Sequence, residues 1–343
     1  MRALKALTYD ELQASVLALG LERYRADQLA DWVYQKHVSD FDSMTNLPLG
    51  QRRDCARQFD LTPCEEVVRR TSSRDGTSKF LLRFRDGAAV EAVLMPMAGH
   101  HTACISTQVG CRFACKFCLT ARRGLVRNLA ADEIVAQVLH VRRSVPSSGL
   151  NVVFMGMGEP LDNFEPVVRS IRVLSAPQLA NIGARRITVS TTGLPQRIRE
   201  LAELDLRVKL AVSLNASNDS DRKRLMPVSG RHSLQETLDA ARFFAERTKH
   251  HVTLEYVLLR DTTDRPEDAR RLRALGDANG PFKLNLIPFN PEPRLRFARP
   301  EIERVRQFES SLEGAFRSVT VRWSMGTDIE AACGQLFGGA AEP

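Results

Sequence analysis

Apolar residues in the first 60 positions recur at helical spacing. Thr8 and Glu11 have the spacing of a capping box, which predicts a helix over residues 8–19. A second helix is predicted over residues 24–36, because its apolar residues fall on one face. We therefore expect residues 1–62 to form a small helical accessory domain.

Apolar residues that alternate with their neighbours beside the Asp86-Gly87 turn predict a β-hairpin. The two strands are expected at residues 79–85 and 88–95, and an Asp-Gly pair is a typical turn between antiparallel strands. This hairpin is expected to form a linker, residues 63–96, between the helical domain and the core.

From residue 103 onward, short β-rich runs alternate with segments of helical period. Strands are predicted at residues 103–108, 151–155, 186–190, 207–214, 251–259 and 282–288, with a further one at 318–324. Helices are predicted at residues 132–142, 164–174, 195–204, 234–246, 266–278 and 302–312. The alternation favours a parallel sheet with right-handed crossovers, an open or closed α/β barrel over residues 97–330. Ligands in such folds bind beyond the carboxyl ends of the strands.

Composition and charge narrow the class of protein. Hydrophobic residues make up 43% of the 343 residues and charged residues 26%, which is typical of a globular protein. The longest apolar runs are too short to cross a bilayer, and no apolar segment typical of a signal peptide precedes the first acids. We therefore expect a cytoplasmic protein with no membrane partner. Lys and Arg outnumber Asp and Glu by 49 to 41, which favours a polyanionic partner, although a solvated basic surface is the alternative.

The seven cysteines are an odd number in a chain without an export signal. A disulfide framework is therefore not expected, and clustered cysteines indicate metal ligands or reactive thiols. Cys55 and Cys64 stand alone, and we interpret them as structural.

Three cysteines form a C-x3-C-x2-C run, Cys111, Cys115 and Cys118, just past a predicted strand. Thiolates suit iron–sulfur clusters or zinc. A structural zinc site takes four ligands, and no fourth Cys or His follows at suitable spacing. Three ligands leave one metal position open, as a catalytic cluster requires, whereas packing or zinc binding is the alternative.

This run resembles the motif of the radical S-adenosylmethionine (SAM) superfamily, with the aromatic Phe117 just before the last cysteine. The resemblance implies a partial (β/α)6 barrel in which Cys111, Cys115 and Cys118 hold a [4Fe–4S] cluster. The fourth iron of the cluster would bind SAM, whose cleavage gives a 5′-deoxyadenosyl radical.

Polar residues follow several of the predicted strands. Gly158 and Glu159, in Gly-Met-Gly-Glu-Pro, resemble the element of that superfamily that binds the SAM amino group, although a tight turn is the alternative. Further matches to SAM-contacting positions, each of which could instead be a cap or turn residue, are Ser190, Ser213, Leu214, Asn215 and Asn290.

Two further cysteines lie outside the run. Cys104 precedes it by seven residues and Cys333 lies near the C-terminus, and a pair of unassigned thiols suits a carrier and a resolving group. Buried small side chains are the alternative. Over nearly its whole length the chain resembles the RlmN/Cfr family of RNA adenine methyltransferases. The sequence motifs that carry the resemblance include CISTQVGC, GMGEPL, RLMPVS, NLIPFNP and DIEAACGQL.

That resemblance implies a reaction that uses two SAM molecules per turnover. Cys333, on a tail over residues 331–343, would take a methyl group from one SAM. The radical from the second would remove a hydrogen from it, and the resulting methylene radical would add to C2 of adenine. Attack by Cys104 on Cys333 would then release 2-methyladenosine and leave a disulfide. Glu91 matches the proton acceptor, although an exposed strand carboxylate is the alternative.

The family's substrates are 23S rRNA, at the peptidyl-transferase loop, and in several members tRNA, at the adenosine 3′ of the anticodon. We expect a monomer that receives electrons from a donor such as flavodoxin and acts on an unpaired or flipped base. The cluster loop carries basic residues that could hold flanking phosphates: Arg112, Lys116, Arg122, Arg123 and Arg127. Another possible RNA contact closes the helical domain, at Arg52, Arg53 and Arg57.

Three other functions are compatible with parts of the pattern. A Cfr-like enzyme would methylate C8 of the same base with the same cysteines. A non-catalytic RNA-binding protein would hold structural zinc, and an activating or maturase radical SAM enzyme would not need Cys104 and Cys333.

Overall fold

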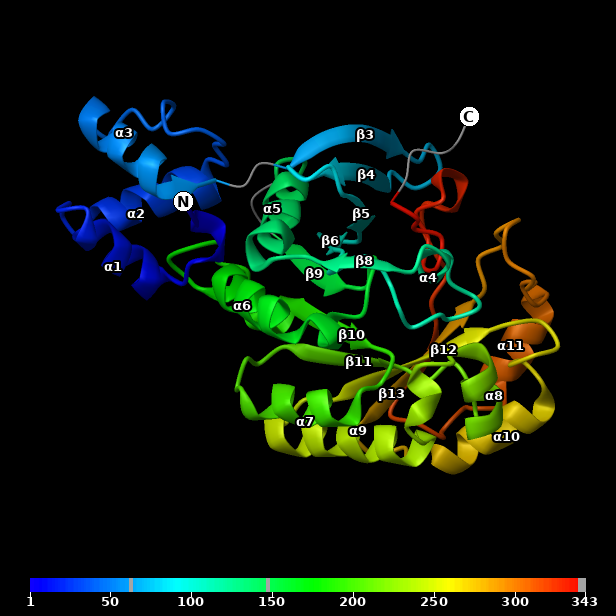
Figure 1. The fold of residues 1–343 in the computed structure, drawn as a ribbon. Coiled ribbons are helices and arrows are strands. Elements are labelled where there is room, and N and C mark those ends of the chain that lie inside the picture. Colours follow the sequence, from blue (N-terminus) through cyan, green and yellow to red (C-terminus); the bar gives the residue numbers. More distant parts are fainter. Residues whose placement is uncertain (62–63, 146–148, 339–343) are drawn as a thin grey trace.

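The computed structural model describes residues 1–61, 64–145 and 149–338, and its central element in that part of the chain is a ten-stranded mixed sheet (Figure 1). The strands run in the order β14-β13-β12-β11-β10-β9-β6-β5-β4-β3. Their bounds are β3 (Glu65–Thr71), β4 (Ser78–Arg83), β5 (Ala89–Met97), β6 (His100–Cys104), β9 (Leu150–Phe154), β10 (Ile187–Thr191), β11 (Lys209–Ser213), β12 (Val252–Leu258), β13 (Phe282–Pro288) and β14 (Val319–Val321).

The strands from β6 to β14 pair in parallel, and the sheet does not close because β14 and β3 lie at opposite edges. Alternate side chains of these strands serve different faces. In β12, Leu254 and Tyr256 belong to the main hydrophobic core, whereas Glu255 and Val257 line a cavity on the other face. The predicted α/β fold, an open barrel, is confirmed.

Helices cover the outer face of the parallel strands (Figure 1). Each predicted core helix is present within a few residues of its expected bounds. The helices are α1 (Tyr9–Ala18), α2 (Arg25–Ala30), α3 (Leu49–Gln58), α4 (Leu119–Arg122), α5 (Ala131–Arg142), α6 (Phe164–Ser175), α7 (Pro195–Glu203), α8 (Asp219–Leu225), α9 (Leu234–Thr248), α10 (Pro266–Leu275) and α11 (Ile302–Ser310).

The N-terminal helices begin as the sequence predicts. The Thr8 side chain accepts a hydrogen bond from the Glu11 amide while the Glu11 carboxylate accepts one from the Thr8 amide, which completes the capping box. The second helix is shorter than predicted, because α2 gives way to a π-helical turn over Asp31–Gln35. Strands β1 (Arg2–Ala3) and β2 (Phe59–Asp60) pair and join the two ends of this region.

The N-terminal region packs against the barrel through a continuous hydrophobic core that includes Leu4 and Phe59. The predicted boundary at residues 62 and 63 lies outside the described residues. The division into residues 1–62, 63–96, 97–330 and 331–343 therefore stays a prediction.

The predicted hairpin around Asp86-Gly87 is confirmed as β4 and β5, which pair antiparallel. Its role differs from that of a bridging linker, because β5 pairs with β6 and thus extends the barrel sheet. Strand β3 was not predicted. Most of its side chains are charged and exposed, as suits an edge strand, and so they lack the apolar alternation of a half-buried strand.

The first barrel strand was predicted too far along the chain, at residues 103–108, whereas β6 covers His100–Cys104. Strand β6 ends at Cys104, and β7 (Gln108–Gly110) is a separate strand that pairs antiparallel with β8 (Leu125–Asn128). The residues between them belong to a bend whose Ser106 is held at both its backbone groups by the Gln137 side chain. The C-x3-C-x2-C run therefore lies in the segment between β7 and β8, and the pairing of these two strands closes that segment into a loop.

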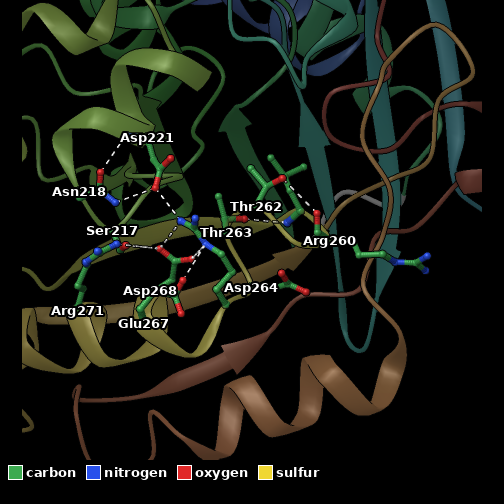
Figure 2. Close-up of polar contacts among 12 residues, drawn as sticks. Ser217, Asn218, Asp221, Arg260, Thr262, Thr263, Asp264, Glu267, Asp268 and Arg271 are labelled. Carbon is green, nitrogen blue, oxygen red and sulfur yellow. Dashed lines mark hydrogen bonds and ion pairs between the residues drawn. The ribbon is translucent and has the colours of Figure 1, made fainter.

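A polar network fixes the start of α10 to the loop after β11 (Figure 2). The buried Asp268 carboxylate accepts hydrogen bonds from Arg265 at 2.7 and 3.2 Å and from Ser217 at 2.6 Å. Arg265 also donates to Asp221, which accepts from Asn218. The loop that follows Asn215 is thereby held in one position.

Candidate active site

The three cysteines of the run lie together at the carboxyl end of the barrel. Burial, followed by the nearby Cys118 and Cys111 thiols, raises the pKa of Cys115, and burial also raises the pKa of Cys111, to about 12. The pKa of Cys118 is raised by burial too. Binding a soft metal removes these protons and offsets that burial, so the donor set fits an iron–sulfur cluster.

The same thiols do not form a site for a single ion. In the described part of the chain, no three His, Cys, Asp or Glu side chains are arranged to hold one metal ion. A [4Fe–4S] cluster differs, because each cysteine ligates its own iron and the sulfur atoms need not converge on one point.

A cavity of about 170 Å³ lies beside Cys118, inside the barrel. Most of the residues expected to contact SAM line it, and so does the tail cysteine. The expected residues on its wall are Cys118, Gly158, Glu159, Ser190, Ser213, Asn215, Asn290 and Cys333. Leu214 is different, because its side chain is fully buried in the main hydrophobic core and does not line the cavity.

The glycines before Glu159 allow two backbone segments to approach closely. A Cβ on Gly156 would lie 2.7 Å from the Ile105 carbonyl carbon, and one on Gly158, whose φ is +102°, would lie 2.6 Å from the Gln108 side chain. The two glycines thus allow the 105–108 bend to pack closely against this turn, and both also line the cavity.

Glu159 is buried, and both of its carboxylate oxygens are oriented by the backbone. One accepts a hydrogen bond from the Leu161 amide at 3.0 Å and the other from the Thr192 amide at 2.7 Å. Burial raises the pKa of this carboxyl, while these amides act in the opposite direction. Its amide in turn donates to Gln108, so a rigid frame presents the carboxylate to the cavity.

The polar residues at the other strand ends are held by different partners. Asn290 donates to the Cys333 carbonyl at 3.1 Å, so it fixes the tail cysteine rather than standing free in the cavity. Asn215 accepts a hydrogen bond from the Val257 amide at 3.1 Å. Ser190 donates weakly to Glu255, at 3.4 Å.

Two charged residues of the site were not predicted. Glu255 is buried, lines the cavity and has one carboxylate oxygen without a hydrogen bond in the described structure; Arg322 lies 3.6 Å from that oxygen. Cys333, followed by Glu255 and Cys104, raises the pKa of Arg322. A lone acid in the apolar run VTLEYVL was the only available signal for Glu255.

Cys104 and Cys333 are electrostatic neighbours, as the resemblance requires. Burial, followed by the charge of Cys333, raises the pKa of Cys104 to about 12. Both carry free thiols, as do the other five cysteines, so the expected disulfide is not part of this structure. Cys333 is exposed and lines the cavity, whereas Cys104 is buried and does not line it.

Glu91 does not line the cavity. Its carboxylate lies 3.0 Å from Lys79 and accepts hydrogen bonds from the amides of Phe337 and Gly338 at 2.6 and 3.1 Å. The alternative interpretation, an exposed strand carboxylate, is therefore wrong, because Glu91 is buried under the C-terminal tail. In this state it anchors the tail.

The tail runs beside α4 (Figure 1), where backbone carbonyls hold it. The Leu119 amide donates to Gly334, the Thr120 hydroxyl to Leu336, and Arg123 to Phe337 and Gly338. Arg123 is thus a tail anchor, not a free cation for phosphate.

Two other basic residues of the cluster loop are also neutralised. Arg112 pairs with Asp162, and Arg127 pairs with Glu133 and Asp86. Lys116 and Arg122 have no carboxylate partner among the described residues. In the N-terminal region, Arg52 donates to backbone carbonyls and Arg57 lies 3.5 Å from Asp54.

The structure also contains no helix, within its described residues, of the length and apolarity needed to cross a bilayer.

Comparison with known proteins places the chain. Residues 105–273 match the Radical SAM superfamily, and residues 3–57 match the ribosomal RNA large subunit methyltransferase N-terminal domain. A relative named probable dual-specificity RNA methyltransferase RlmN, from Thermotoga sp. (strain RQ2), is 45% identical over 336 residues, 98% of this chain and 97% of the relative. Another of that name, from Symbiobacterium thermophilum, is 44% identical over 97% of this chain and 90% of its own length.

A solved structure agrees over the whole chain. The crystal structure of a radical SAM methyltransferase from Sphaerobacter thermophilus superimposes with a TM-score of 0.94 and 43% sequence identity, covering 99% of this chain and 100% of that one. The radical SAM family implies a [4Fe–4S] cluster and SAM. The chain therefore belongs to the RlmN family of radical SAM RNA methyltransferases.

Proposed function

We propose that the protein methylates C2 of adenosine in 23S rRNA and in tRNA, with Cys333 as the methyl carrier. One observation carries the proposal: the Cys333 thiol of the tail lines the same cavity as Cys118 and Glu159. A thiol in that position can meet both the methyl group of SAM and a base that enters the cavity. The names of the relatives, which are called probable dual-specificity RNA methyltransferases, support the proposal that two kinds of RNA are substrates.

The cavity residues suit the binding of SAM beside the cluster. Cys111, Cys115 and Cys118 would each hold one iron, and Glu159 would accept a hydrogen bond from the SAM ammonium through its remaining lone pairs. When bound, the reduced cluster supplies the electron that cleaves SAM to a 5′-deoxyadenosyl radical. Ser190, whose hydroxyl lies at the cavity wall, would orient the cofactor.

We assign two SAM molecules to each turnover, one as methyl donor and one as radical source. Cys333 accepts the methyl group, and its sulfur then links protein to RNA through a methylene carbon. The Cys104 thiolate, buried next to it, would attack that sulfur: an S–S bond forms as the bond from sulfur to the methylene carbon breaks, and that carbon takes up a proton to become the methyl group of the product. Arg322 stands near both thiols, and its charge acts against the larger effect of burial, which raises the pKa of Cys104. We further propose a monomer reduced by a flavodoxin-type donor.

Glu91 is assigned the removal of the C2 proton, and this assignment requires the tail to move. In the present state its carboxylate is occupied by two backbone amides and Lys79. Entry of RNA would have to withdraw residues 337 and 338 before Glu91 could reach a base. The proposal therefore couples proton removal to tail displacement.

The decisive experiment is the mass of the peptide that contains Cys333. Protein expressed with its cluster and purified without air is digested, and the expected result is a population heavier by one methyl group on Cys333. A Cys118→Ala variant, which loses a cluster ligand but keeps Cys333, tests whether the cluster is needed for this mark. An unmodified Cys333 after incubation with SAM, in protein shown to contain iron, would refute the carrier role.

Product analysis then identifies the target. Ribosomal RNA fragments and tRNA treated with the enzyme are digested to nucleosides, and 2-methyladenosine is expected from both. A Cys104→Ala variant should instead accumulate covalent protein–RNA adduct. If 8-methyladenosine is the product, the methylated carbon is C8 and not C2. If the purified protein contains zinc in place of iron, the radical reaction is excluded.

A further inference from the structure

A second cavity, of about 390 Å³, lies on the outer side of the cluster loop. Two segments far apart in sequence form it. The loop contributes Lys116 and Arg122, and the segment between β13 and α11 contributes Arg294, Arg296 and Phe297. Arg122 donates a hydrogen bond to the Arg294 carbonyl, so the two segments are joined at the cavity rim.

The cavity is strongly cationic. Four of its lining side chains are Lys or Arg, and no Asp or Glu lines it in the described part of the chain. Only Arg294 among the four has a carboxylate partner within the described residues, the buried Glu292 at 2.7 Å. Lys116, Arg122 and Arg296 are exposed and unneutralised there, and this arrangement favours a polyanion.

The cationic cavity adjoins the catalytic cavity. Phe297, on its wall, packs edge to face against Phe289 with ring centroids 6.1 Å apart, and Phe289 lines the catalytic cavity. Cys115 lines the outer cavity and Cys118 the inner one. An RNA strand whose base enters the catalytic cavity therefore passes close to the cationic cavity.

We infer that this cavity, defined by Lys116, Arg122, Arg294, Arg296 and Phe297, is a subsite for a nucleotide that flanks the target adenosine. The inference rests on the proposed RNA methyltransferase function. The arginines hold one or two phosphates of the single strand, and the Phe297 ring offers an aromatic surface for a neighbouring base. Sequence alone pointed to five basic residues of the loop. The structure keeps two of these and adds three residues from the 294–297 segment.

The test is RNA affinity of the iron-loaded enzyme. Fluorescence anisotropy measures binding of a single-stranded RNA nonamer with a central adenosine, for wild type, R122E/R296E and R185E/R186E. Arg185 and Arg186 make a matched control, because they are exposed, have no partner among the described residues and lie before β10, at the opposite end of the strands. Circular dichroism and iron content confirm that each variant is folded. Lys116 is left unchanged because it adjoins Cys115.

We expect R122E/R296E to weaken binding about 10- to 100-fold and to lower the slope of log K against log salt by about 0.7 for each RNA phosphate that the variant no longer neutralises. The control should stay within about twofold of wild type. Equal affinities of R122E/R296E and R185E/R186E would overturn the subsite. F297L should weaken binding by about fivefold or more. If F297L binds the RNA as tightly as wild type, Phe297 does not stack on a base and is not part of the subsite. Failure of the proposed function is distinguishable, because wild type itself would then not methylate RNA.

Discussion

Asp268 is a buried acid outside the active site whose charge should contribute to stability. Its side chain is 1% exposed, and it accepts two hydrogen bonds from Arg265 and one from Ser217 (Figure 2). Asp268→Asn keeps the shape but removes the charge and places an amide NH₂ group among donors. A hydrogen bond to a charged group contributes about 1.5–3 kcal/mol and a neutral one about 1 kcal/mol. Over the two Arg265 hydrogen bonds, the expected decrease in the free energy of unfolding is about 3 kcal/mol, near the lower limit for a broken buried pair because Arg265 keeps Asp221.

The matched control is Asp239→Asn. Asp239 pairs with Arg242, also three residues away on a helix, but the two side chains are 47% and 38% exposed. An exposed pair of this kind contributes less than about 0.5 kcal/mol. Urea unfolding at neutral pH, with equal iron content in all proteins, measures both changes. If Asp268→Asn and Asp239→Asn lower the free energy of unfolding equally, the network does not stabilise the loop after β11 as argued.

Three further outcomes are expected. Gly158→Ala should lower the melting temperature and the yield of folded protein, because its φ is positive and its Cβ would clash with Gln108, whereas Gly183→Ala, with open space around its Cβ, should change neither. Glu292→Gln should cost stability only at higher pH: the Arg294 hydrogen bond holds the pKa of Glu292 below its ordinary 4.5, so the stabilisation is complete above about pH 5 and is lost as the pH falls through the lowered value. Identical pH profiles of wild type and Glu292→Gln would contradict this. Glu91→Gln should speed hydrogen exchange at the amides of residues 337 and 338 about fivefold, because a charged acceptor becomes neutral, and unchanged exchange would show that Glu91 does not anchor the tail.

Local sequence determined much of the barrel in advance. Strand β13 was predicted with its observed bounds, because a buried parallel strand is a short apolar run that neighbouring residues define. The cluster cysteines and most cavity residues were found because they follow such strands. What depends on distant partners was missed: Glu91 meets the tail across 246 residues, and Arg322 acquires its role only when Cys104 and Cys333 are brought beside it. The function of Gly156 likewise depends on the 105–108 bend, which periodicity did not reveal.

The C-terminal tail is held at both ends of a short stretch, by Asn290 at the Cys333 carbonyl and by Arg123 and Glu91 at residues 337 and 338. These hydrogen bonds reach backbone carbonyls and amides, so they depend weakly on which side chains the tail carries. They depend strongly on how many residues separate the two ends. One residue inserted or deleted between Cys333 and Gly338 would move the thiol out of register with the cavity. Apart from Gly334 and Gly338, whose φ values are positive, these hydrogen bonds therefore constrain the length of the tail more than the identity of its side chains.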